Sequence, residues 1–226
     1  MISALVKAFA QLSDPRLRGV LIFGIAAAAA AYLALVGLAW VLLGHTSWFE
    51  THWVDRASHV LVGLVTLLAP LPFFPALSTT AMSFRLEAVA EAVEGRHYPA
   101  LSAPRPQPWT EVLVVSLRFL AATLVINLVA LPVYALLLLT GFAFILTLVI
   151  NGYLLGREYF ELVALRRLSP AEARILFRNR LGQWWLAGAV IAFLFTVPLL
   201  NLAAPVLGAA LMVHRFQALR PLDDRV

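Results

Sequence analysis

The last uncharged stretch of the chain restricts the fold most, because its length suits neither one membrane span nor two. It covers residues 182–213, which is 32 residues without a formal charge. A single spanning helix needs about 20 apolar residues, and two spans with a turn need about 40. Basic residues favour the cytoplasmic side of a membrane. They flank this stretch at both ends, as Arg178, Arg180, His214 and Arg215.

The middle of this stretch predicts a turn at membrane depth. Val197–Pro205 contains two prolines and an asparagine, which disfavour a continuous helix. We therefore expect residues 182–215 to form a re-entrant hairpin that enters the bilayer, turns at Asn201 and returns. Irregular backbone at this depth is tolerated only where protein buries it or where it lines a water-filled cavity. The hairpin thus favours a channel or transporter over a simple anchor.

Composition places the rest of the chain in a membrane as well. Hydrophobic residues make up 62% of the 226 residues, charged residues make up 13%, and the mean hydropathy is +0.88. Further long uncharged runs cover residues 19–43, 60–84 and 119–156. Because alternating strand patterns are absent, we expect an all-α integral membrane protein. It should combine a few long transmembrane helices with half-inserted, re-entrant helical hairpins and interfacial amphipathic helices.

We expect a single membrane domain over residues 1–226, with both termini on the cytoplasmic side. Its predicted segments are an interfacial helix (1–14), long transmembrane helices (15–43 and 57–97), a helical hairpin (110–168), a basic cytoplasmic helix (170–181) and the re-entrant hairpin (182–215). Residues 44–56 between the two long helices have the composition of an outer-face aromatic belt. Whether the 110–168 hairpin spans fully or inserts half-way stays open at this point.

Particular residues should shape these segments. Ser169, Pro170 and Glu172 predict a capped helix start. Prolines should kink or unwind the second long helix and, with Thr140-Gly141, divide the 110–168 hairpin into two helices. These prolines are Pro70, Pro72 and Pro75 in the long helix and Pro132 in the hairpin.

Several classes of function are disfavoured by the sequence. The chain has no cysteine, so thiol catalysis and cysteine-ligated metals are excluded. It has no P-loop, nucleophile elbow, HExxH motif or dinucleotide fingerprint, so we expect neither an enzyme nor a bound cofactor. The net charge of +5 lies mostly beside the apolar runs. That placement indicates orientation and contact with anionic lipids rather than nucleic-acid binding.

One short stretch has the chemistry of an oxyanion site. Asp14-Pro15 predicts a helix N-terminus, where backbone N–H groups lack helical acceptors, and Arg16 and Arg18 follow at once. Free N–H groups, the positive end of the helix dipole and guanidinium groups together suit a tetrahedral anion. The alternative is that both arginines are ordinary cytoplasmic anchors and Asp14 is the only anion present.

Four further residues are candidates for a polar pathway. Glu111 and Arg118 share a helix face but lie about 10 Å apart, too far for a local ion pair. Arg118 begins an apolar run, where it either serves function or extends to the headgroups. Asn151 and Asn201 lie near membrane depth. Their amides could hydrogen-bond a hydrated anion or join helices.

Three stretches resemble the family of the bacterial sulfate permease CysZ and its EI24 relatives. They are Leu12–Val20, Asn151–Glu161 with the basic helix after it, and Val197–Val206. They occur in the expected order and span nearly the whole chain. The resemblance implies an oligomeric inner-membrane protein that supplies sulfate for cysteine synthesis, by a passive or proton-influenced route.

The resemblance also implies a sulfate-binding stretch at Arg16, Leu17, Arg18 and Gly19. The family pattern there reads glycine, hydrophobic residue, arginine, arginine. In this chain Arg16 replaces the glycine, and Gly19 occupies the position of the second arginine. Either Arg16 compensates, or this relative moves a different oxyanion. The competing hypothesis is a scaffold that transports nothing and organises lipids or partner proteins.

Overall fold

The structure is a computed structural model that describes residues 1–43 and 52–219, and the side chains of the expected aromatic belt lie outside the part it describes. The described residues form helices and no strand, which confirms the all-α class. The helices are α1 (Ile2–Ala10), η1 (Gln11–Ser13), α2 (Pro15–Leu43), α3 (His52–Leu68), η2 (Leu71–Phe73), α4 (Phe74–Ser83), α5 (Leu86–His97), α6 (Trp109–Leu138), α7 (Ala143–Ala164), α8 (Pro170–Asn179), α9 (Leu181–Thr196) and α10 (Leu200–Leu219).

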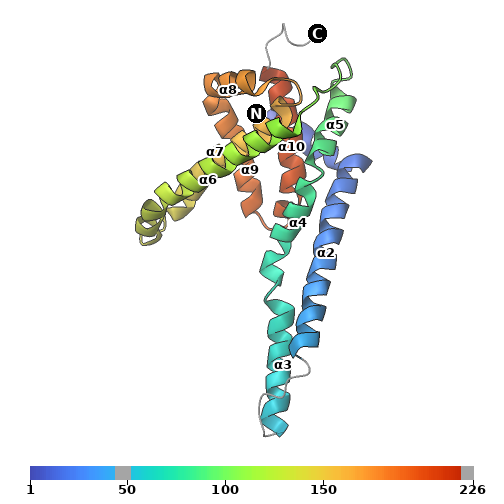
Figure 1. Cartoon of the computed structure of the whole chain (residues 1–226), viewed down its shortest axis with the longest axis vertical. Helices are drawn as coiled ribbons and strands as arrows, with labels where there is room; N and C mark the ends of the chain where they lie inside the picture. Colours follow the sequence, from blue (N-terminus) through green and yellow to red (C-terminus); the bar gives the residue numbers. More distant parts are fainter. Residues whose placement is uncertain (44–51, 220–226) are drawn as a thin grey trace.

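The helices gather into a head from which long helices project. Helices α1, α5 and α7–α10 form this head, while α2 runs beside α3 and α4, and α6 leaves at an oblique angle (Figure 1). Four segments are long and apolar enough to cross a membrane, namely Pro15–Leu42, Val60–Ser83, Trp109–Leu138 and Leu200–Leu219. The first three expose most of their apolar surface, which suits lipid contact. The fourth is instead covered by protein.

The prolines interrupt the second long helix as predicted. α3 ends at Leu68, and η2 and α4 continue the chain. Pro70 and Pro72 lack the N–H groups that helical carbonyls four residues earlier would accept. The carbonyl of Leu67, in the last turn of α3, accepts the hydroxyl of Tyr32 on α2 at 2.5 Å. Such a partner is needed where the backbone faces lipid.

The hairpin of α6 and α7 turns only at residues 139–142. Gly141 has a φ of +77° in this turn, a conformation that glycine adopts without strain. Pro132 lies inside α6, so the prediction that it helps to divide the two helices is wrong. A proline removes one backbone hydrogen bond, and neighbouring apolar turns can continue a membrane helix through it.

The final hairpin of α9 and α10 turns slightly before the expected residue. The reversal uses Val197, Pro198 and Leu199, and Leu199 has a φ of +66°. Asn201 already belongs to the first turn of α10, where its N–H donates to the carbonyl of Val197 at 3.0 Å. The prediction of a turn at Asn201 is therefore wrong by about two residues. Pro198 is the reason, because it cannot donate a helical hydrogen bond.

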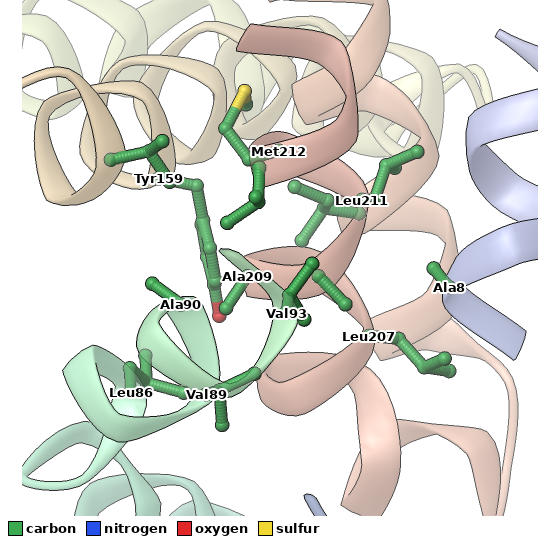
Figure 2. Close-up of a cluster of buried hydrophobic side chains, with 14 of the residues drawn as sticks. Ala8, Leu86, Val89, Ala90, Val93, Tyr159, Leu207, Ala209, Leu211 and Met212 are labelled. Carbon is green, nitrogen blue, oxygen red and sulfur yellow. The ribbon is translucent and has the colours of Figure 1, made fainter. Parts of the chain in front are cut away.

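Helix α10 forms the centre of the head. It packs against α1, α5, α7 and α9, and its residues from Ala204 to His214 are all buried. In Figure 2, Tyr159 of α7 reaches toward Ala90 of α5 and Ala209 of α10. A Cβ at Gly208 would lie 3.0 Å from the Tyr159 ring, so the ring packs closely against this glycine.

Candidate anion sites

The N-terminus of α2 already holds one anion. The Asp14 carboxylate accepts the N–H of Arg16 at 2.9 Å and the guanidinium of Arg96 at 2.9 Å. The hydrogen bond from Arg16 and then the contact with Arg96 hold the pKa of Asp14 below its usual value. A sulfate ion at this helix end would therefore have to displace Asp14 or bind beside it.

The two arginines of this stretch point in different directions. Residues two apart on a helix lie about 200° apart around its axis. The Nε of Arg18 donates back to the carbonyl of Leu12 at 3.1 Å. Arg16 and Gly19 line a groove between α2 and α5, together with Arg85, Glu87 and Glu91.

The other two residues of the stretch differ in the space around them. Leu17 is buried in the core, so only its backbone is available to a ligand. A Cβ added at Gly19 would meet nothing within 4 Å. The groove thus has room for a larger side chain at Gly19.

The structure does not bring Glu111 and Arg118 together. Both carboxylate oxygens of Glu111 accept hydrogen bonds from the Arg105 guanidinium. Arg105 also donates its backbone N–H to the carbonyl of Arg166 at 2.8 Å. Glu111 therefore joins the first turn of α6 to Arg105, and Arg105 joins the linker to the end of α7.

Arg118 and Asn151 line two separate cavities. Arg118 lies in a cavity among α6, α7 and α8, with Arg157, Arg174 and Arg178. Asn151 lies in a cavity among α4, α7 and α9 that is also lined by Thr79, Thr147 and Thr196. Asn201 lines neither of these cavities.

A buried ion-pair network escaped the sequence analysis. Glu94 of α5 contacts Arg166 at 3.2 Å and Arg167 at 2.7 Å, at the end of α7. Arg166 also pairs with Glu87 at 2.9 Å. The sequence did contain a sign of this network. Glu87 and Glu94 are seven residues apart on one helix face, and Arg166 and Arg167 are adjacent in the sequence. Pairs buried this deeply hold each other in place, since either charge alone would be costly.

A second missed cluster surrounds His214. Its Nε2 is 3.1 Å from the amide nitrogen of Gln11, and its Nδ1 is 2.9 Å from the Tyr98 hydroxyl. The ring of His97 lies edge-on at 5.2 Å. His214 is 3% exposed, and its contacts join α10 to the helices around it. Its position after a long apolar run gave no sign of this.

These observations define an all-helical membrane protein whose head contains an arginine-lined cavity. Among the described residues, no three His, Asp or Glu side chains gather as a metal site. The chain belongs to the EI24 family, whose description is "Sulfate transporter CysZ/Etoposide-induced protein 2.4" and which matches residues 4–205. No curated protein and no solved structure matches the chain.

Proposed function

We propose that the protein carries sulfate, or a related tetrahedral oxyanion, across the bacterial inner membrane to supply cysteine biosynthesis, and that it catalyses no reaction. Membership of a family described by a sulfate transporter, over residues 4–205, is the observation that carries this proposal. The cavity lined by Arg118, Arg157, Arg174 and Arg178 supports it, because planar guanidinium groups match the geometry of such anions.

Within this proposal, residues 16–19 form the first binding site. Arg16 and Arg18 supply charge, Leu17 supplies a backbone N–H group in the first turn of α2, and Gly19 leaves space beside the groove. Arg118 and Asn151 are the better pathway candidates, since each lines a cavity. We assign Glu111 and Asn201 to supporting roles, because Glu111 pairs with Arg105 and Asn201 begins α10.

We further propose that residues 1–226 act as one membrane domain with both termini in the cytoplasm. The chain's N-terminus, α8 and the C-terminal end of α10 lie at the same end of the molecule (Figure 1). A cysteine at the exposed residue Ala218 should react with a membrane-impermeant reagent only from the cytoplasmic side. Reaction from the outside would refute this orientation.

We also propose assembly into a homo-oligomer. Leu199, at the turn of the α9–α10 hairpin, is 82% exposed in the single chain. Irregular backbone at membrane depth needs protein around it, and further copies of the chain would provide it. Native mass measured in nanodiscs should show more than one copy per particle; monomers alone would contradict the proposal.

The binding site can be tested by replacing its two arginines. In R16A/R18A, sulfate affinity measured by calorimetry should fall at least tenfold, because each charge-assisted hydrogen bond contributes roughly 1.5–3 kcal/mol. The matched control is R180A, which removes an exposed arginine at the junction of α8 and α9. Unchanged affinity in a correctly assembled R16A/R18A would reject the site.

A scaffold without transport activity is the second candidate. Asp14 and Arg18 are both engaged in internal contacts, which is the observation that favours it. A scaffold would leave the wild-type protein without measurable sulfate binding, whereas the transport proposal requires binding that the arginine substitutions weaken.

A further inference from the structure

The cavity that contains Arg118 has an excess of positive charge. Four guanidinium groups, from Arg118, Arg157, Arg174 and Arg178, line it, and Glu161 is the carboxylate among the lining residues. Glu161 is paired with Arg157 at 2.9 Å. Four positive charges and one negative charge leave a net charge of +3 at the cavity wall.

The remaining arginines are available to a ligand. In the part of the chain that the structure describes, neither Arg118 nor Arg178 has a carboxylate within 4.0 Å. Arg174 uses its Nε to donate to the carbonyl of Pro170 at 3.0 Å, which leaves its terminal nitrogens free. Three uncompensated guanidinium groups around one cavity repel each other unless an anion lies among them.

The cavity is larger than a small anion requires, and much of its wall is apolar. Its volume is about 350 Å³, within the range of ligand-binding pockets. The rings of Phe160 and Phe177 pack at 5.2 Å and form part of the wall. Val115, Leu165 and Leu181 also line it. An anion attached to an apolar group fits this combination.

The location of the cavity suits the membrane interface. α8 carries its arginines on a short amphipathic helix whose Ile175 is 61% exposed. Such a helix typically lies in the headgroup region, with its apolar side toward the acyl chains. If α8 lies in this region, its Arg174 and Arg178 would be near the phosphate groups of anionic lipids.

We propose that this cavity binds a tetrahedral oxyanion of the phosphate or sulfate type, held by Arg118 from α6, Arg157 from α7, and Arg174 and Arg178 from α8. The anion has two possible sources, the phosphate of an anionic lipid headgroup and a free inorganic ion. Binding here would join α6 to α7 and α8 through one shared charge. The site stands apart from residues 16–19, so the proposal holds whether or not the protein transports sulfate.

The test compares R118Q/R178Q with R180Q in two measurements. R180Q removes one nearby exposed arginine that does not line the cavity, so it controls for the loss of a positive charge outside the cavity. In the first measurement, native mass spectrometry counts the phosphatidylglycerol that the protein retains from nanodiscs of phosphatidylglycerol and phosphatidylcholine. In the second, calorimetry in a neutral detergent measures the affinities for inorganic sulfate and inorganic phosphate.

We expect R118Q/R178Q to reduce binding at least tenfold in one measurement, while R180Q resembles wild type. A loss of retained phosphatidylglycerol identifies the lipid headgroup as the source, and a loss of inorganic-ion affinity identifies the free anion. If R118Q/R178Q and R180Q behave alike in both measurements, the proposal is overturned. Should R118Q/R178Q fail to assemble, R174Q/R178Q replaces it, because both side chains are exposed on α8.

Discussion

At the scale of single residues, Gly19 is the position where the resemblance to the CysZ family implies an arginine. The structure shows open space at Gly19, beside the groove that Arg16 lines. Its backbone is ordinary helix, so the position accepts a side chain without strain. Packing therefore does not require a glycine at this position.

Restoring that arginine should strengthen anion binding. In G19R, a third guanidinium would join Arg16 and Arg18 at the start of α2. One added charge-assisted hydrogen bond should tighten sulfate binding about tenfold, measured by calorimetry. G19Q, which adds bulk without charge, is the matched control and should stay near wild type. Equal affinities for G19R, G19Q and wild type would show that sulfate does not bind at this helix end.

The local structure around residues 14–19 was partly predictable from the sequence. The helix start at Pro15 and the position of Asp14 beside it followed from capping chemistry, and the structure shows both. Arg16 and Arg18 were treated as one pair, although the helical period places residues two apart on different faces. The partner of Asp14, Arg96, is 82 positions away, so no local pattern could reveal it.

At the scale of helices, α7 and α9 pack through glycines. A Cβ at Gly188 would lie 2.0 Å from the carbonyl oxygen of Gly152 and 2.3 Å from the nitrogen of Gly156. A Cβ at Gly156 would meet the carbonyl oxygen of Trp184 at 2.6 Å. These neighbours are backbone atoms that cannot turn aside, so the two helices depend on the absence of side chains. Small residues spaced four apart are typical of close helix packing in membranes.

Adding one methyl group at this contact should destabilise the protein. G188A would force α7 and α9 apart, at a cost of about 1–3 kcal/mol or more. We expect its midpoint of thermal unfolding in detergent to fall by roughly 4–10 °C. In G182A, a substitution at another glycine of α9, nothing lies within 4 Å of the added group. G182A should unfold at or slightly above the wild-type temperature, and similar losses in both variants would contradict this account of the packing.

Helix boundaries were predicted best where they depend on local chemistry. The start of α8 shows the expected capping box, in which the Ser169 N–H donates to Glu172 at 2.8 Å. The breaks near Pro70 and Gly141 likewise follow from one or two residues. Pro132 behaved differently, since α6 continues through it. Whether a proline ends a membrane helix depends on the surroundings of the freed carbonyl, which the local sequence does not specify.

At the scale of the whole molecule, the burial of α10 shows that a long apolar run can be covered by protein and not by lipid. The sequence gives α10 the hydropathy of a lipid-facing helix, yet 72% of its apolar window is buried within the protein. The contacts of His214 join α10 to Gln11 and Tyr98, and the Glu94–Arg166–Arg167 network joins α5 to the end of α7 beside it. Hydropathy reports only that a residue avoids water, so it cannot separate contact with lipid from contact with protein. The fold class was therefore predictable, and the arrangement of the head was not.

The cavity lined by Arg118, Arg157, Arg174 and Arg178 lies in the head. Long apolar helices extend from this head (Figure 1). The proposed transport requires that anions bound in the head then cross the membrane. A scaffold with the same helices would bind lipid or partners and leave the sulfate concentration on the two sides unequal. The two accounts differ most directly in whether sulfate moves.

The decisive measurement is therefore uptake of radiolabelled sulfate into liposomes that contain the purified wild-type protein. We expect uptake above that of protein-free liposomes, inhibition by excess unlabelled sulfate, and little inhibition by the same concentration of chloride. R16A/R18A, reconstituted in equal amount, should reduce the initial rate at least tenfold. Uptake by the wild-type protein equal to that of protein-free liposomes, with assembly intact, would contradict the proposed transport.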